Sequence, residues 1–162
     1  MVAFMVCLNF TSCSDDEKIE ELTGGANSAI VGTWQVSKVE TITKANGEIV
    51  GRNVEVSTDD SENYIRVFEA DKTWETWAEN SAGRWILENS GLWALTTGKL
   101  QLSYSVESEV KTETVIVNAI SEEELILQFP EKWKNGYYEG NVWVDETTSR
   151  IETLTKKTNL KL

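Results

Sequence analysis

The chain has 162 residues, 40% of them hydrophobic, and 27 acidic residues against 15 basic ones give it a formal net charge of −12. This length suits one domain with a core of its own, and such a negative surface repels phosphate backbones, which argues against a nucleic-acid partner. The absence of histidine removes the commonest metal ligand and the usual general base, so we expect no metal, no cofactor and no enzyme activity.

The chain begins with an apolar segment that leads to a cysteine. Residues 1–12 read MVAFMVCLNFTS, and Cys13 is followed by the acidic residues 15–17. This arrangement resembles the signal peptide and lipobox of bacterial lipoproteins. The resemblance implies that residues 1–12 are cut off and that Cys13 receives the lipid. Phe10 departs from the usual Leu, and because residues 1–12 carry no Lys or Arg, we expect the natural start to lie upstream.

The alternative role for the cysteines is structural. In a structural role, Cys7 and Cys13 would form a disulfide or remain buried thiols. Cys7 lies inside the segment that is cut off in a lipoprotein, which argues against such a pair. The resemblance implies an outer-membrane lipoprotein in the cell envelope of a two-membrane bacterium. The acids after Cys13 also resemble an export signal of surface-exposed lipoproteins. Their plain alternative role is to keep the segment solvated.

Residues 13–29 are predicted to form the lipidated cysteine and an acidic tether. They are polar after Cys13 and contain Gly24-Gly25. A flexible coil of this length spans about 20–25 Å on average. The tether therefore separates the membrane from a domain at residues 30–162.

Apolar residues in this domain recur with period two, which is typical of β-strands. Leu100, Leu102 and Tyr104 alternate with polar residues, and Val115 and Val117 lie in another β-branched run. Turn signals separate such runs at Asn46-Gly47, Asp71-Lys72, Asn89-Ser90-Gly91, Thr97-Gly98, Ser121-Glu122 and Asn135-Gly136. The pattern predicts an all-β, antiparallel up-and-down meander of about eight to ten strands, closed into a barrel because closure removes exposed edges.

A two-residue turn at Asn135-Gly136 predicts the register of one hairpin. Lys134 then faces Tyr137, Trp133 faces Tyr138, Lys132 faces Glu139, Phe129 faces Val142 and Leu127 faces Val144. Such cross-strand pairs stabilise a hairpin. Pro130 lacks a backbone donor and is expected at a sheet edge or a bulge.

Four stretches in order resemble lipocalins and the bacterial lipocalin-like domains, which are calycin-type β-barrels. They are VGTWQVSKVE (31–40), YIRVFEADKTWETW (64–77), AGRWILE (82–88) and AISEEELILQF (119–129). The first holds the Gly-x-Trp motif as Gly32 and Trp34. The resemblance implies that Trp34 closes the base of the barrel under a basic residue of the last strand. Arg150 is the expected partner, and Lys156 is its rival.

The acidic residues do not form a recognisable catalytic or metal-binding motif. Glycosidases need two carboxyl groups that face each other across a cleft, and most acids here lie at turns or solvent-facing positions. Asp59, Asp60 and Glu62 lack the spacing of a calcium-binding loop. We therefore expect no catalytic residue and no metal site.

The aromatic residues supply the candidate ligand contacts. Tyr64, Arg66 and Phe68 share one strand face, and Trp74 and Trp77 point to opposite faces. The candidate contacts are Tyr64, Arg66, Phe68, Trp74, Trp85 and Tyr104. The alternative is that these rings only fill the barrel.

Two functions follow from these expectations. One is a membrane-anchored lipoprotein whose barrel holds a small apolar or amphipathic ligand in its lumen. The other is an accessory surface lipoprotein whose outward aromatics contact a protein or a glycan, with no lumen ligand. We expect the chain to act as a monomer in either case.

Overall fold

The computed structural model describes residues 26–57 and 63–158. The predicted signal peptide at 1–12, the lipid site at Cys13 and the tether as far as residue 25 lie outside the described residues. Asp59, Asp60 and Glu62 also lie outside them. Within the described ranges, no helix has the length and apolarity needed to cross a membrane.

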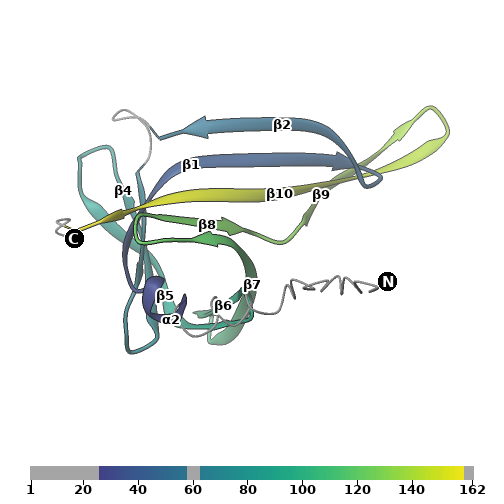
Figure 1. The fold of residues 1–162 in the computed structure, drawn as a ribbon. Helices are drawn as coiled ribbons and strands as arrows, with labels where there is room; N and C mark the ends of the chain where they lie inside the picture. The colour runs from purple at the N-terminus through teal and green to yellow at the C-terminus, as the bar shows by residue number, and fades with distance from the viewer. Residues whose placement is uncertain (1–25, 58–62, 159–162) are drawn as a thin grey trace, which may run out of the picture.

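One short helix and ten strands make up the described chain (Figure 1). The elements are α2 (Ala26–Ala29), β1 (Gly32–Ala45), β2 (Glu48–Val56), β3 (Tyr64–Phe68), β4 (Thr73–Glu79), β5 (Trp85–Thr96), β6 (Lys99–Val106), β7 (Glu109–Ile120), β8 (Glu124–Gln128), β9 (Lys132–Glu139) and β10 (Val142–Lys157).

The strands form one antiparallel barrel with eight strand positions. One edge of β1 pairs with β10 along almost its whole length, which closes the barrel. The other edge of β1 pairs first with β3 and then with β2, and the other edge of β10 pairs with β8 and β9. Since β2 and β3 share one position and β8 and β9 share another, ten segments fill eight positions. The predicted all-β closed meander is confirmed.

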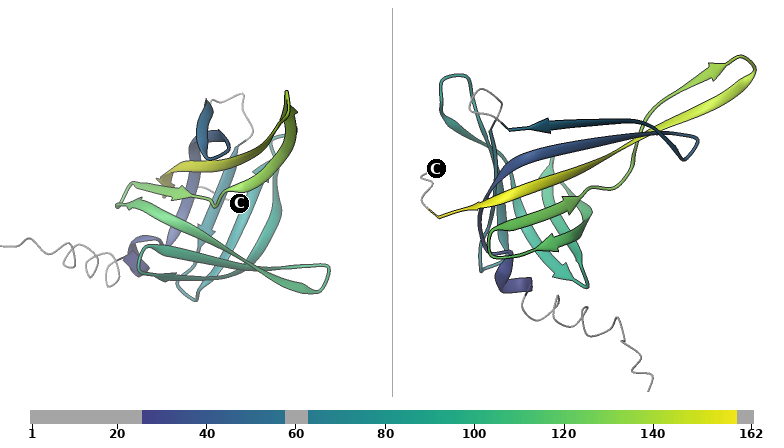
Figure 2. Two further views of the ribbon diagram at one scale, coloured as in Figure 1. Left: turned by 90° about the vertical axis from the view of Figure 1, so that its right-hand side faces the viewer. Right: turned by 45° about the horizontal axis from the view of Figure 1, so that its top comes forward.

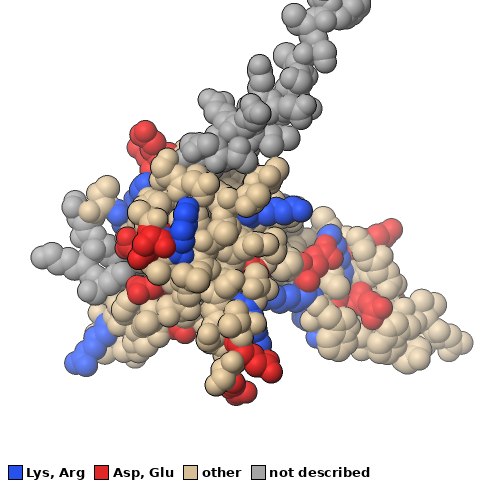
Figure 3. Space-filling model, turned by 90° about the horizontal axis from the view of Figure 1, so that it is seen from below, with Lys and Arg blue, Asp and Glu red and all other residues tan. Residues whose placement is uncertain are grey.

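The first and last strands are longer than the barrel. They have 14 and 16 residues, and their distal halves pair with β2 and β9 in a four-stranded extension that we call the arm. Figure 2 shows both hairpins of the arm projecting in the same direction. Seen from below, the far end of the arm carries few charged side chains (Figure 3).

Four of the six predicted turns join consecutive strands, namely Asn46-Gly47, Asp71-Lys72, Thr97-Gly98 and Ser121-Glu122. The prediction of a turn at residues 89–91 is wrong, because β5 runs through them. Gly91 bends β5 close to its neighbour: a Cβ there would lie 1.8 Å from the Ser103 carbonyl oxygen. Glycine at this position allows the two strands to approach each other closely and does not form a turn.

The predicted turn at Asn135-Gly136 is also wrong, and with it the five predicted pairs. Residues 135 and 136 lie inside β9, and the hairpin turns after Glu139, which faces Val142. Gly140 has the positive φ of 62° that this turn requires. Gly136 instead makes room for the Trp143 ring, which a Cβ would approach to 2.2 Å. Pro130 lies between β8 and β9, at the break in that strand position, as expected.

An apolar core fills the end of the barrel next to α2, which we call the closed end. Its largest side chains are Trp34, Phe68 and Trp93, all buried. The Trp34 indole Nε1 donates to the Ile30 carbonyl oxygen at 2.7 Å, and Phe68 meets Trp93 edge to face at 6.1 Å. Burial of such rings is the main stabilising term at this end.

Lys156, not Arg150, is the basic partner of Trp34. The Lys156 Nζ lies 5.1 Å from the centre of the Trp34 ring, and the two residues face each other across β1 and β10. Arg150 lies further along β10, opposite Thr41. Gly32 completes the motif, because a Cβ there would lie 2.7 Å from the Lys156 side chain. The prediction that Arg150 is the partner of Trp34 is wrong, because Arg150 lies too far from the closed end.

Candidate functional site

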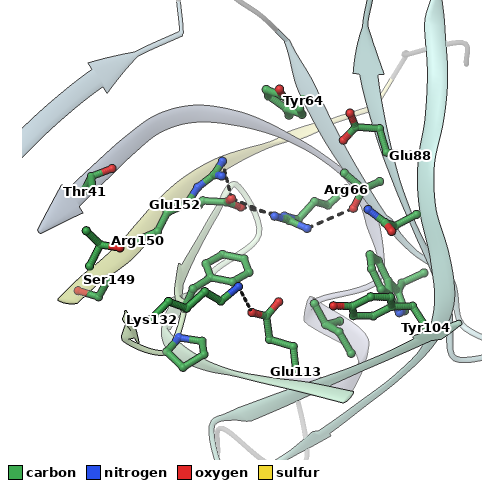
Figure 4. Close-up of a pocket in the computed structure, with 17 residues that line it drawn as sticks. Thr41, Tyr64, Arg66, Glu88, Tyr104, Glu113, Lys132, Ser149, Arg150 and Glu152 are labelled. Atoms are coloured by element: carbon green, nitrogen blue, oxygen red, sulfur yellow. Dashed lines mark hydrogen bonds and ion pairs between the residues drawn. The ribbon is translucent and has the colours of Figure 1, made fainter. Parts of the chain in front are cut away.

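A cavity of about 550 Å³ occupies the half of the barrel from which the arm projects (Figure 4). Its walls come from strands on all sides of the barrel. Aromatic lining is provided by Tyr64, Trp74, Tyr104 and Phe129, and charged lining by Arg66, Glu88, Glu113, Lys132, Arg150 and Glu152. The cavity is therefore amphipathic rather than apolar.

The aromatic wall is held by contacts between neighbouring strands. Trp74 and Tyr104 meet edge to face at 6.1 Å. The Trp74 indole Nε1 donates to the Ser103 carbonyl oxygen at 3.3 Å, in the space that Gly91 leaves. These contacts fix the ring positions before any ligand is bound, which lowers the entropy cost of binding.

Two arginines around one buried glutamate form part of the charged wall. Arg66 Nε and Nη2 donate to the two Glu152 carboxylate oxygens at 2.8 and 2.9 Å, and Arg150 Nη2 lies 2.8 Å from Oε1 of the same group. The Glu152 side chain is 0% exposed. Such a bidentate pair gives a buried carboxylate the hydrogen bonds that it needs.

The pair of Arg66 and Glu152 stays ionised. Burial by itself raises the pKa of Glu152, but the guanidinium groups of Arg66 and Arg150 outweigh burial and hold that pKa below its usual value. Burial likewise acts to lower the pKa of Arg66, yet Glu152 outweighs it, so the pKa of Arg66 lies above its usual value. Arg66 and Glu152 therefore both carry their charges at neutral pH.

Further contacts fix the Arg66 guanidinium. Its Nη1 donates to the Thr76 hydroxyl at 3.2 Å, and its Cζ lies 5.1 Å from the centre of the Phe129 ring. A cation over a ring gains electrostatic energy from the π-system. Arg66 is thus held from three sides and has little freedom to move toward a ligand.

A second ion pair closes another part of the wall. Lys132 Nζ lies 2.8 Å from Glu113 Oε1, joining β9 to β7. Glu88 is the extra residue of a bulge in β5, where Thr76 faces Asn89 and Trp77 faces Leu87. Bulges redirect side chains. Among the described residues, no three acidic, Cys or His side chains gather in a way that would hold a metal ion.

A second cavity of about 430 Å³ adjoins the first beneath β2 of the arm. Thr41, Tyr64 and Arg150 line both cavities. Lys38 and Glu55 line the second one alone. Arg150 therefore lies at the junction of the two spaces.

The structure brings four of the six predicted contact residues to the first cavity, namely Tyr64, Arg66, Trp74 and Tyr104. Phe68 instead packs in the closed end. Trp85 starts β5, opposite Glu79, and lines neither cavity. Trp74 and Trp77 do point to opposite faces: Trp74 is buried inside, while Trp77 donates to the neighbouring Glu75 carboxylate.

Sequence reasoning missed Glu152, which is central to the charged wall. A signal was present, because Arg150, Glu152, Leu154 and Lys156 alternate with other residues on one strand face. The apolar Leu154 marks that face as inward. The role of Arg150 in the lumen was missed for the same reason.

Residues 30–127 match the family described as the lipocalin-like domain, which is more than half of the 162-residue chain. The match ends within β8, so β9 and β10 lie beyond it. A search among curated proteins found no match.

Proposed function

Because the chain belongs to the lipocalin-like domain family, we propose that its barrel binds a small amphipathic ligand in the 550 Å³ cavity. The observation that carries this proposal is the division of the cavity into an aromatic wall and a charged wall. Ligand sites combine apolar surface with a few placed polar groups. The charged lining favours an amphipathic ligand over a wholly apolar one, and binding over catalysis is the role that the family supports.

Fluorescence of N-phenyl-1-naphthylamine, a neutral aromatic probe, tests this proposal. The probe should brighten on binding wild-type protein, and Tyr104→Ala should weaken its binding about fivefold because apolar contact is lost. Tyr137→Ala is the matched control, since Tyr137 lies on the arm and lines neither cavity. Absence of binding, or equal weakening by both variants, would contradict a lumen site.

We further propose that a lipid at Cys13 anchors the barrel to the outer membrane of a two-membrane bacterium. The support is the apolar segment 1–12 followed by a cysteine and an acidic stretch. Mass spectrometry of protein taken from its native membrane should find Cys13 at the N-terminus with a diacylglycerol mass added. Unmodified Cys13 with residues 1–12 attached would contradict the proposal.

A second candidate function, glycan binding, rests on the aromatic residues of the arm. Trp133 and Tyr138 are 68% and 69% exposed, and Tyr137 and Trp143 are also exposed. Tyr138 and Trp143 lie edge to face at 5.0 Å. Exposed rings next to polar groups suit stacking on neutral sugar rings.

Affinity electrophoresis in gels that contain neutral polysaccharides tests the glycan candidate. Wild-type protein should be retarded, and Trp133→Ala should remove the retardation. Trp77→Ala is the control, because Trp77 lies outside the arm. Unchanged mobility of the wild-type chain in every polysaccharide would rule this candidate out.

A further inference from the structure

We propose that Arg150 receives a singly charged oxyanion, a carboxylate or sulfonate, on the head group of the lumen ligand. This inference rests on the proposed lumen function and specifies the ligand as an anionic amphipath. The head group would lie at the junction of the two cavities, with the apolar part against Trp74 and Tyr104.

The first argument is the balance of charge in the cluster of Arg66, Arg150 and Glu152. Arg66 makes two hydrogen bonds to Glu152, one to each carboxylate oxygen, at 2.8 and 2.9 Å. The Arg150 Nη2 lies 2.8 Å from one of those oxygens, Oε1. Two guanidinium groups and one carboxylate leave one positive charge in excess. This excess favours an anion near Arg150.

The second argument is access. The Arg150 side chain is 46% exposed, whereas that of Arg66 is 13% exposed. Arg66 is also covered by Phe129 and bonded to Thr76. A ligand therefore reaches the Arg150 guanidinium, while Arg66 acts as a positioning residue that holds Glu152 and, through it, Arg150.

The third argument is the set of neighbouring groups. Thr41 lies opposite Arg150 on β1, and Lys38 lines the adjoining cavity. Of the acids in the walls, Glu113 is paired with Lys132 and Glu55 accepts from Asn53 Nδ2 at 2.9 Å. Glu88 lies on the other side of Arg66 from Arg150 (Figure 4). The second cavity is thus lined by two cations, Arg150 and Lys38, and by one acid, Glu55.

The test compares two probes that share a ring system and differ in charge. These are 8-anilino-1-naphthalenesulfonate, an anion, and N-phenyl-1-naphthylamine, which is neutral. Arg150→Gln should weaken the anionic probe about tenfold, because a charge-assisted hydrogen bond is lost. Binding of the neutral probe should change by less than about twofold, because that probe makes no charge-assisted contact, and circular dichroism checks that the variant is folded.

Arg84→Gln is the matched control for net charge, because Arg84 is exposed and lines neither cavity. Arg84→Gln should change the binding of neither probe. If the neutral probe binds but Arg150→Gln weakens both probes equally or neither, the anion site is overturned and the lumen function stands. If neither probe binds the wild-type chain, the lumen function itself fails.

Discussion

The two halves of this barrel are built from the same strands but are stabilised differently. On β3, Phe68 packs in the closed end and Arg66 faces the cavity. On β10, Leu154 is part of the apolar core, and Glu152, two residues earlier, is the buried acid. Residues two positions apart on the same inward strand face thus lie in the apolar core and in the candidate site, respectively.

The difference lies in what balances burial. At the closed end, Trp34 buries a large ring and needs one hydrogen bond, which Ile30 accepts. In the cavity, Glu152 is equally buried but requires two arginines to offset its desolvation. Stability at the closed end therefore depends on large apolar side chains such as Trp34, and stability in the cavity depends on the ion pairs of Glu152. The predictions below separate these two requirements.

The largest expected effect is at the closed end. Trp34→Ala should lower the free energy of unfolding by about 3–5 kcal/mol, because it removes buried surface and leaves a cavity. Urea denaturation followed by circular dichroism measures this loss. A decrease no larger than that of an exposed tryptophan would contradict the assignment of Trp34 as the core of this end.

The next effect is in the cavity. Glu152→Gln should cost about 3 kcal/mol of stability, because Arg66 is left buried without its counter-ion. Urea denaturation again measures the change. Glu131→Gln is the control, since Glu131 pairs with Lys44 at the surface and exposed ion pairs contribute little. Equal losses in the two variants would show that burial of Glu152 is unimportant.

Acid should reduce the difference between wild type and Glu152→Gln. The folded-state pKa of Glu152 lies below its ordinary value of 4.5, so the unfolded chain binds the proton more readily. Its contribution to stability is therefore complete above about pH 4.5 and is lost as the pH falls through the lower, folded-state pKa. Asp71 and Glu131 also have lowered pKa values, but they are present in both proteins. A difference that grows on acidification would reverse the assignment.

A smaller effect is expected for the cation above the closed end. Lys156→Met keeps the aliphatic chain over Trp34 but removes the charge, and should cost about 0.5–1 kcal/mol. Lys157→Met is the control, because Lys157 is the next residue along β10 and its side chain is exposed. Chemical denaturation of the two variants measures the difference. Identical stabilities would show that the cation–π contact does not stabilise the fold.

The smallest effect is expected on the arm. Trp133→Ala should change the free energy of unfolding by less than about 0.5 kcal/mol, since its ring is 68% exposed and packs in neither half of the barrel. The denaturation midpoint measures it. A loss as large as that of Trp34→Ala would mean that the arm is part of the folding core.

The parts of the fold that depend on local chemistry were predictable from sequence. Period-two alternation indicates strands wherever one face is buried. Asn46-Gly47 forms the expected turn because both residues adopt positive φ, at 49° and 86°. Gly32 and Trp34 were identified from a motif, and their contact with a basic residue of the last strand exists, although Lys156 makes it.

The parts that depend on distant contacts were not predictable. Asn135-Gly136 has the composition of a turn, but the hairpin turns at Gly140 because Trp143 needs the space above Gly136. Glu152 resembles any solvent-facing acid until the register of β10 places it against Arg66, 86 residues away. The pairing of strands, rather than the identity of single residues, decides both outcomes.

Closure by β10 also has a consequence for how the protein folds. Ser37 and Thr153, joined across β1 and β10, are 116 residues apart, so this pairing requires almost the whole domain to be available. Until it forms, β1 and β8 are open edges that invite mispairing between unfolded chains. Arg66 meanwhile has no Glu152 beside it. Arrival of the last strand removes the aggregation hazard and completes the binding site in the same event.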